Sequence, residues 1–286
     1  ILMPHLPMVL AGINPLDWSI IRDSLFAKYV FEGIAFTVIL SIFGQVVGSL
    51  IGLMLYFMRS SKIAPLRWFT SVYIWLFRGT PLLVQVVVFW QIFPYLGIAN
   101  SLDHLIYFKG IFGTTYDYFL TGVLGAAIAL ALNEGAYMAE IVRAGIDSID
   151  PGQMEAAKSL GMTYGQGMRR VVLPQAFRVI VPPLGNEFNS MLKNSALAST
   201  AGVYELFGLS ASLGRATGAW LSYMIIAVIW YLVMTTIWGL IQRQIEQRLN
   251  ASNIDPALRV RGTWWQRLIG TTRGEPVVVT GAPAQR

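Results

Sequence analysis

Apolar residues gather into five long runs, separated by shorter segments that carry most of the charges. The first run has 26 residues without a charge, about 39 Å of helix, which is enough to cross a bilayer with some tilt. A mixed aromatic, apolar and charged segment precedes it, at residues 14–32, and is typical of an interfacial helix. The pattern predicts an all-α, polytopic membrane protein with about five transmembrane helices, at residues 33–58, 68–96, 118–146, 177–197 and 220–241.

Charged residues between the runs predict the orientation of the chain. Basic residues predominate after the first, third and fifth runs, at residues 59–67, around 169–178 and in the tail. Because cytoplasmic loops carry an excess of Lys and Arg, we expect the N-terminus outside and the C-terminus in the cytoplasm. Three regions follow: an N-terminal segment with the interfacial helix (1–32), a transmembrane domain (33–247) and a basic, flexible cytoplasmic tail (248–286).

Two of the runs contain residues that disturb a helix. In the second run, Gly79-Thr80-Pro81 is predicted to bend or break the helix, because proline withdraws one backbone hydrogen bond and glycine relaxes the turn. The fourth run is predicted to be broken early, at Pro182-Pro183 and Gly185. Polar residues then recur on one helical face, which should meet protein or a cavity and not lipid: Asn186, Ser190, Lys193 and Asn194.

Two further spacings predict packing within the bundle. Gly44, Gly48 and Gly52 repeat every four residues along one face of the first run, and small residues there permit close contact with another helix. Near the cytoplasmic end of the third run, Glu140 and Arg143 are three residues apart. An ordinary ion pair at a helix end is the favoured interpretation of that pair.

Composition supports a membrane protein and makes other classes improbable. Of the 286 residues, 55% are hydrophobic and 13% are charged, with a mean hydropathy of +0.56, too apolar for a soluble globular protein. The net charge of +6 lies in clusters beside apolar runs, so nucleic-acid binding is not expected. There is no cysteine and the histidines, His5 and His104, are isolated, so no metal site is expected. Residues 1–13 lack a basic flank and a cleavage site, so no signal peptide is predicted.

One polar segment, residues 150–174, has the marks of a structured loop. Asp150 is a helix cap followed by Pro151, and Gln153 completes a capping-box pattern. Gly161 is predicted to stop this first short helix. A second capping box, Thr163 with Gln166, begins another helix, which Leu173-Pro174 is predicted to end because proline cannot donate to the preceding turn.

The same segment resembles the EAA loop of permease subunits of bacterial ABC importers. The resemblance rests on Glu155-Ala156-Ala157, then Gly161 after three residues, then Val171-x-Leu173-Pro174 after nine more. Flanking residues, and Arg78-Gly79-Thr80-Pro81-Leu82 in the second run, resemble the polar amino acid branch, the histidine/glutamine/arginine permease type. The resemblance covers roughly residues 33–247 and implies the transmembrane-domain fold of type I ABC importers.

The resemblance also implies partners and a location. Importers of this type work in the bacterial cytoplasmic membrane as two permease subunits over two ATPases, with an external amino-acid-binding protein delivering substrate. The sequence has no GxxxxGK[ST] phosphate loop, so ATP and Mg would be bound by the partner ATPase, and no catalytic residue or cofactor is expected in this chain. We expect the ATPase to dock on a short set of residues: Glu155, Ala156, Ala157, Leu160, Gly161, Leu173 and Pro174. The alternative is that Gly161 and the alanines only shape the loop.

Charges inside the runs are candidates for substrate binding, because each costs about 2.5–3.5 kcal/mol on insertion scales. An amino acid needs an anion for its ammonium and donors for its carboxylate. Acidic and basic side chains, and the free N–H groups beside the helix break, suit these tasks. The candidates for the substrate pathway are Arg78, Gly79, Thr80, Gln85, Asn133, Glu134, Tyr137, Glu187, Lys193 and Asn194.

Structural alternatives stay open for several of these residues. Glu187 and Lys193 would serve equally to fix helix packing or a dimer interface, and Gly79–Pro81 would serve only as a kink. Arg78 and Gln85 would share a face if their helix ran undisturbed. Among function classes, a membrane enzyme lacks an intramembrane histidine or cysteine, and a stand-alone channel or secondary transporter would not need the EAA spacing.

Overall fold

In the computed structural model, residues 15–96, 108–109, 115–116 and 120–250 are described. Contacts divide the chain into two units, Ile1–Glu246 and Gln247–Arg286. In the second unit, only the last turn of the final helix lies among the described residues. The predictions for residues 1–13 and for the tail beyond residue 250 lie outside the described part.

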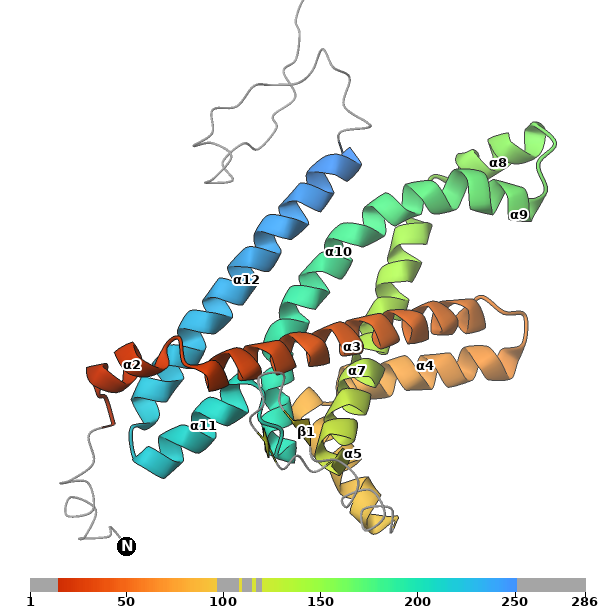
Figure 1. Ribbon diagram of the computed structural model, residues 1–286. Helices are drawn as coiled ribbons and strands as arrows, with labels where there is room; N and C mark the ends of the chain where they lie inside the picture. The colour runs from red at the N-terminus through yellow and green to blue at the C-terminus, as the bar shows by residue number, and fades with distance from the viewer. Residues whose placement is uncertain (1–14, 97–107, 110–114, 117–119, 251–286) are drawn as a thin grey trace, which may run out of the picture. The chain divides into compact units, whose positions relative to one another are not determined.

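The described chain is almost entirely helical (Figure 1). Its long helices are α3 (Lys28–Arg59), α4 (Ala64–Gly79), α5 (Leu82–Tyr95), α7 (Leu120–Asp147), α10 (Leu173–Asn194) and α12 (Trp220–Asn250). Shorter helical elements are α2 (Trp18–Ser24), α8 (Pro151–Ser159), α9 (Tyr164–Gly167), a π-helix (Met168–Val172), a 3-10 helix (Ser195–Ala201) and α11 (Leu206–Thr217). Two strands of two residues each, β1 (Phe108–Lys109) and β2 (Thr115–Tyr116), pair antiparallel, and the described chain is otherwise helical, in agreement with the all-α prediction.

Three described helices are long and apolar enough to cross a membrane: Lys28–Arg59, Thr121–Asp147 and Trp220–Leu249. The pair α4 and α5 would make a fourth span, bent by 108° at the break between them. Helix α10 has 22 residues, but its composition is too polar for it to be counted as a membrane span. Length and composition therefore support up to four of the five predicted spans within the described residues.

The glycine stripe on α3 is a packing surface, as predicted. A Cβ added at Gly48 would lie 2.6 Å from Glu134 Cβ, and one at Gly52 would lie 2.4 Å from Met138 Cβ. Gly44 faces Met191 of α10, 3.2 Å from its sulfur. Distances under 3.0 Å leave no space for a methyl group, so α3 and α7 cross closely only because these positions lack side chains.

An ion-pair cluster joins the ends of α3 and α7. Arg143 binds Glu140 at 2.8 Å, as the spacing predicted, and also binds Asp147 at 3.0 Å. Arg59 at the end of α3 pairs with the same Glu140. The cluster therefore fixes the end of α7 that leads into α8.

The prolines of α10 do not break the helix, so that prediction is wrong. α10 runs continuously through Pro182 and Pro183. Side chains of α12 support this stretch: Trp238 Nε1 donates to Gly185 O at 2.7 Å, and Gln242 Nε2 donates to Pro182 O at 3.3 Å. Gly185 permits a close approach, because a Cβ there would lie 2.7 Å from Gln242 Cδ.

The prediction that Leu173-Pro174 ends a helix is also wrong. The chain continues from α9 through the π-helix into α10, and Pro174 lies in the first turn of α10. Leu173 N–H donates to Met168 O, five residues back. The wider π turn shifts the carbonyls away from the proline ring, so Pro174 is accommodated where the bonding pattern changes from π to α.

Glu205 joins three helices and was not anticipated. Its carboxylate is fully buried and caps α11 by accepting from Phe207 N and Gly208 N at 2.9 and 2.7 Å. Tyr231 of α12 donates to it at 2.9 Å, and Thr37 of α3 at 3.3 Å. Four donors satisfy the buried charge, so this residue holds α3, α11 and α12 together.

Candidate functional site

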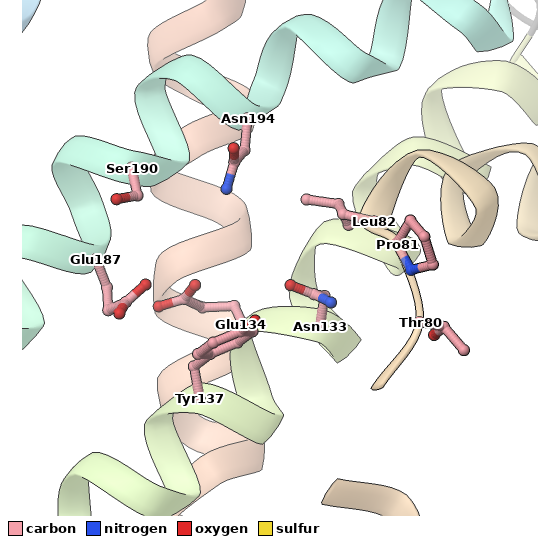
Figure 2. Close-up of a pocket in the computed structure, with 9 residues that line it drawn as sticks. All are labelled: Thr80, Pro81, Leu82, Asn133, Glu134, Tyr137, Glu187, Ser190 and Asn194. Carbon is pink, nitrogen blue, oxygen red and sulfur yellow. The ribbon is translucent and has the colours of Figure 1, made fainter. Parts of the chain in front are cut away.

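A cavity of about 420 Å³ lies where α7, α10 and the break between α4 and α5 meet (Figure 2). This volume is in the range of small-molecule sites. We refer to it as the acidic pocket; it is lined by Thr80, Pro81, Leu82, Asn133, Glu134, Tyr137, Glu187, Ser190 and Asn194. The polar side chains come from elements far apart in sequence, so the pocket is a product of the fold.

The break that forms one wall follows from the Thr80-Pro81 sequence. A residue before proline is pushed out of the helical region, and Thr80 is extended, with φ −116° and ψ 146°. Pro81 O then accepts from Val84 N and Gln85 N, which begins α5 in a new direction. The predicted break is confirmed. It places the N-terminus of α5, the positive end of the helix dipole, at the pocket.

Gln85 and Asn133 close the break with hydrogen bonds. Gln85 Nε2 donates to Phe77 O at 2.9 Å, to Thr80 O at 3.1 Å and to Thr80 Oγ1 at 2.8 Å. Asn133 Nδ2 donates to Phe77 O at 2.9 Å and to Gln85 Oε1 at 3.0 Å. These amides satisfy carbonyls that the lost helical turn left without donors. Both residues were predicted to lie on the pathway, and here they support its wall.

Glu134 is the most buried carboxylate of the pocket, with 4% of its surface exposed. Gln45 Nε2 of α3 donates to its Oε1 at 3.0 Å. Figure 2 shows the carboxylates of Glu134 and Glu187 pointing toward one another across the pocket. Two acids this close repel one another in a buried site, so a bound cation would relieve the repulsion.

The polar face of α10 forms the opposite wall. Glu187, Ser190 and Asn194 are spaced by three and four residues, and all three line the pocket. Ser190 and Asn194, two of the four residues predicted on this face, line the cavity as predicted. Asn186 is exposed and accepts from Gln242 Nε2 at 3.0 Å. Lys193 is exposed and is not among the lining residues, although the sequence placed it on the same face.

Arg78 lies next to the pocket without lining it. Its guanidinium stacks over the ring of Tyr137, 5.2 Å from the ring centroid, and its charge acts on Glu187. Because α4 and α5 are bent by 108°, Arg78 and Gln85 do not share a face. A cation at this point balances part of the charge of the two acids.

The segment 150–174, referred to here as the coupling loop, folds as α8, α9 and the π-helix at the start of α10 (Figure 1). Asp150 accepts from Gly152 N at 2.7 Å, and Thr163 with Gln166 forms the complete capping box, both as predicted. Gln153 instead accepts from Gln175 Nε2 at 3.3 Å. The loop is therefore braced internally.

Exposure separates the coupling residues into two groups. Glu155, Ala156, Leu160 and Gly161 are exposed, and Leu160 is 79% exposed. Ala157 is buried and faces Gly167, where an added Cβ would lie 3.3 Å from Ala157 Cβ. Gly161 has φ +80°, a left-handed conformation that side chains disfavour. Leu173 and Pro174 are exposed at the start of α10.

Three contributors to the pocket were missed by sequence reasoning. Pro81 and Leu82 line it because α5 starts there, and Gln45 orients Glu134 from a neighbouring helix. A glutamine within a run of apolar residues was an available signal for Gln45. Among the described residues, no group of three or more His, Cys, Asp or Glu is placed to hold a metal ion.

Residues 46–251, which include the pocket and the coupling loop, match the profile of the binding-protein-dependent transport system inner membrane components. The chain belongs to this family. The resemblance to ABC importer permeases, inferred from the EAA spacing, is confirmed. The matched segment spans every element that lines the acidic pocket.

Curated relatives and solved structures agree with this family. The chain is similar to the L-cystine transport system permease protein TcyB of Bacillus subtilis, at 38% identity over 86% of this chain and 96% of TcyB. It is also similar to the arginine transport system permease protein ArgU of Corynebacterium glutamicum, at 38% identity over 80% of this chain and 71% of ArgU. A crystal structure of an amino acid ABC transporter with histidines matches with a TM-score of 0.63 and 36% identity, over 87% of this chain and all of that chain.

Proposed function

We propose that this permease moves a polar amino acid into the cytoplasm, using ATP hydrolysed by a separate subunit. The family and the functions of its relatives support this: permeases for L-cystine and arginine, and an amino acid transporter of known structure. The acidic pocket carries the proposal, because it combines the buried Glu134 and the half-buried Glu187 with a helix N-terminus at a break in the bundle. One end of the pocket suits an ammonium group and the other suits a carboxylate.

The amino acid binds in the acidic pocket in a defined orientation. Its ammonium group lies between Glu134 and Glu187, where it relieves the repulsion of the two acids. Its carboxylate lies at the N-terminus of α5, beside Thr80 and within the field of Arg78. Gln85 and Asn133 keep the break in shape. Tyr137 and Asn194 complete the lining. Gly79 is the last residue of α4, directly before the break, and does not line the pocket.

Five spans cross the bacterial cytoplasmic membrane, with the N-terminus outside and the C-terminus in the cytoplasm. The bent pair α4 and α5 forms the second span and α10 forms the fourth, although α10 is polar. Its polar face is turned to the acidic pocket, so lipid need not contact these groups. Basic residues at 59–67 and 169–178 lie on the cytoplasmic side.

The coupling loop docks on the ATPase. Glu155, Ala156, Leu160 and Gly161 form the exposed docking surface, and Leu160 is its apolar anchor. Ala157 holds α8 against the following helix, while Leu173 and Pro174 start the helix that leads to the pocket. Since α10 continues from the loop to Glu187, movement of the loop is transmitted to the pocket without a flexible joint.

The working transporter has further components. A second permease subunit encloses the pathway, an external amino-acid-binding protein delivers substrate, and ATP and Mg bind to the ATPase subunits. The exposed apolar faces of α3, α5 and α12 suit the second permease and lipid. Alternating access follows when ATP closes the ATPases and moves the docked loops together.

Transport by the reconstituted complex tests the proposal. The permease is placed in liposomes with its ATPase, its second permease subunit and the binding protein, and uptake of a panel of labelled amino acids is measured. Uptake should require both ATP and the binding protein. A stand-alone channel or secondary transporter would instead give uptake by the permease without the ATPase, and that result would overturn the proposal.

A further inference from the structure

A second cavity, of about 560 Å³, lies where the coupling loop meets α10. It is lined by Thr163, Gly165, Gln166, Arg169 and Arg170, and we refer to it as the basic cavity. None of these side chains is acidic, and four of the five carry hydrogen-bond donors. The proposed function assigns no role to it.

The two arginines of the basic cavity have no counter-charge in the described part of the chain. The ion pairs found there involve other residues, and neither Arg169 nor Arg170 donates a hydrogen bond to another described side chain or carbonyl. The wider turn of the π-helix brings consecutive side chains closer together around the axis than an α-helix does. Both guanidinium groups therefore reach one cavity.

The capping box adds two more donors to the same cavity. Thr163 Oγ1 accepts from Gln166 N at 3.3 Å, and Gln166 Oε1 accepts from Thr163 N at 2.9 Å. Both bonds use the oxygen atoms, so Gln166 Nε2 and the Thr163 hydroxyl hydrogen are left to donate. The cavity thus presents donors and positive charge only, which is the chemistry of a phosphate site.

An exposed apolar stripe continues from the basic cavity along α10. Leu173 and Phe177 follow Arg169 by four and eight residues, so the three share one face. Leu173 is 41% exposed and Phe177 is 59% exposed, whereas Val172 and Ala176 on the other face are buried. One face of the helix therefore passes from cationic to apolar within three turns.

We propose that this face binds an anionic phospholipid, with its phosphate in the basic cavity and an acyl chain along Leu173 and Phe177. A free anion would leave the apolar stripe uncovered, whereas a phospholipid carries a phosphate for the basic cavity and an acyl chain for the stripe on the same molecule. Basic residues beside the cytoplasmic end of a span attract anionic head groups, and long arginine side chains reach the interface while their stems stay in apolar surroundings. The inference uses the proposed topology but does not depend on which amino acid is carried.

Such a lipid would affect the coupling between substrate binding and ATP hydrolysis. The basic cavity is formed by α9 and the π-helix, which connect the docking surface on α8 to the polar face of α10. A phosphate bound there would stiffen that connection, because it would bridge the capping box and the arginines. Anionic lipid is therefore expected to increase the ATPase stimulation that substrate causes.

Native mass spectrometry of the purified, delipidated permease–ATPase complex tests the proposal. The complex is titrated with dioleoyl-phosphatidylglycerol, with dioleoyl-phosphatidylcholine and with the short-chain dihexanoyl-phosphatidylglycerol. Arg22→Gln/Lys62→Gln is the matched control for Arg169→Gln/Arg170→Gln, because it removes two exposed charges outside the cavity that donate no hydrogen bond to the backbone. Phe177→Ser tests the apolar stripe separately.

We expect the wild type to bind dioleoyl-phosphatidylglycerol more tightly than the phosphatidylcholine. Affinity should fall roughly 10- to 30-fold in the arginine pair and less than about 2-fold in the control pair. Phe177→Ser should lower the affinity for the long-chain lipid several-fold and leave the affinity for the short-chain lipid unchanged. If the arginine pair fails to assemble, the head-group preference of the wild type and the chain-length effect of Phe177→Ser still decide the question.

Three results would overturn the proposal. Equal lipid binding by the wild type and the Arg169→Gln/Arg170→Gln variant would show that the basic cavity is not the lipid site. Equal binding of short- and long-chain lipid, with displacement by inorganic phosphate, would indicate a free-anion site. Loss of the ATPase subunit in the arginine pair, with unchanged lipid binding, would assign the arginines to the protein partner.

Discussion

Gln45 Nε2 on α3 donates a hydrogen bond to Glu134 Oε1 on α7 at 3.0 Å, and both side chains are buried. A neighbouring glycine on α3, Gly48, lies directly against the Cβ and Cγ of the same glutamate. The position of the most buried acid in the pocket is therefore set by the packing of two helices. Substitutions on α3 that never touch the pocket should change its chemistry.

Gly48→Ala tests this relationship. The new Cβ would lie 2.6 Å from Glu134 Cβ, so α7 or the glutamate must shift. We expect amino-acid uptake to fall at least about 10-fold, with a loss of about 1–3 kcal/mol in stability from overpacking. Gly239→Ala is the control, since a Cβ at Gly239 meets nothing within 4 Å. Equal uptake by the two variants, at equal amounts in the membrane, would show that the packing does not position Glu134.

Removing either pocket charge should weaken substrate binding. Glu134→Gln and Glu187→Gln keep the shape of the side chain but lose the anion that faces the ammonium group. A hydrogen bond to a charged group contributes about 1.5–3 kcal/mol, so we expect KM for uptake to rise by roughly 10- to 100-fold. Glu246→Gln, outside the pocket, should leave KM within about 2-fold. Unchanged KM in both pocket variants would exclude these acids from binding.

Gln85→Leu should lower the stability of the complex without changing the charge of the acidic pocket. It removes the donor to Phe77 O and Thr80 O, and the partner of Asn133 Nδ2. Buried groups left without a partner cost about 1–3 kcal/mol each, so the thermal midpoint of the purified complex should fall by roughly 5–10 °C. Gln91→Leu, at an exposed position of α5, should leave the midpoint almost unchanged. A similar midpoint for both variants would mean that the break does not need these bonds.

Substitutions of Gly161 test whether the coupling loop needs the left-handed backbone conformation of this residue. Its φ of +80° is strongly unfavourable for Val and tolerable for Asn. Gly161→Val should abolish stimulation of ATP hydrolysis by substrate, whereas Gly161→Asn should keep much of it. Gly239→Ala on α12 is the control, because Gly239 has an ordinary φ and a Cβ there meets nothing within 4 Å. Full stimulation of ATP hydrolysis by substrate in Gly161→Val would show that coupling does not require the left-handed turn.

The elements governed by local chemistry were predictable from the sequence. Thr80-Pro81 forces an extended residue, Gly161 adopts the left-handed turn, and the Thr163 capping box forms as expected. Each depends on neighbours within a few residues of the chain. The polar face of α10 was predictable in part, because helical periodicity alone places Ser190 and Asn194 together.

Sequence-based predictions are wrong or missing where the structure depends on contacts between residues that are far apart in the chain. Pro182 and Pro183 were expected to break α10, but side chains from α12 support that stretch. The binding of freed carbonyls by the amide of Gln85 also depends on the fold, while its place on the substrate pathway stays a prediction. The roles of Gln45 and Glu205 depend on partners on other helices, which no local pattern reveals.

A cryo-electron microscopy structure of the complete transporter with the transported amino acid bound would show whether the acidic pocket is its binding site. We expect density in the pocket, with the ammonium group within hydrogen-bond distance of Glu134 or Glu187 and the carboxylate at the N-terminus of α5. An amino acid bound elsewhere on the pathway, with both acids out of contact, would contradict it.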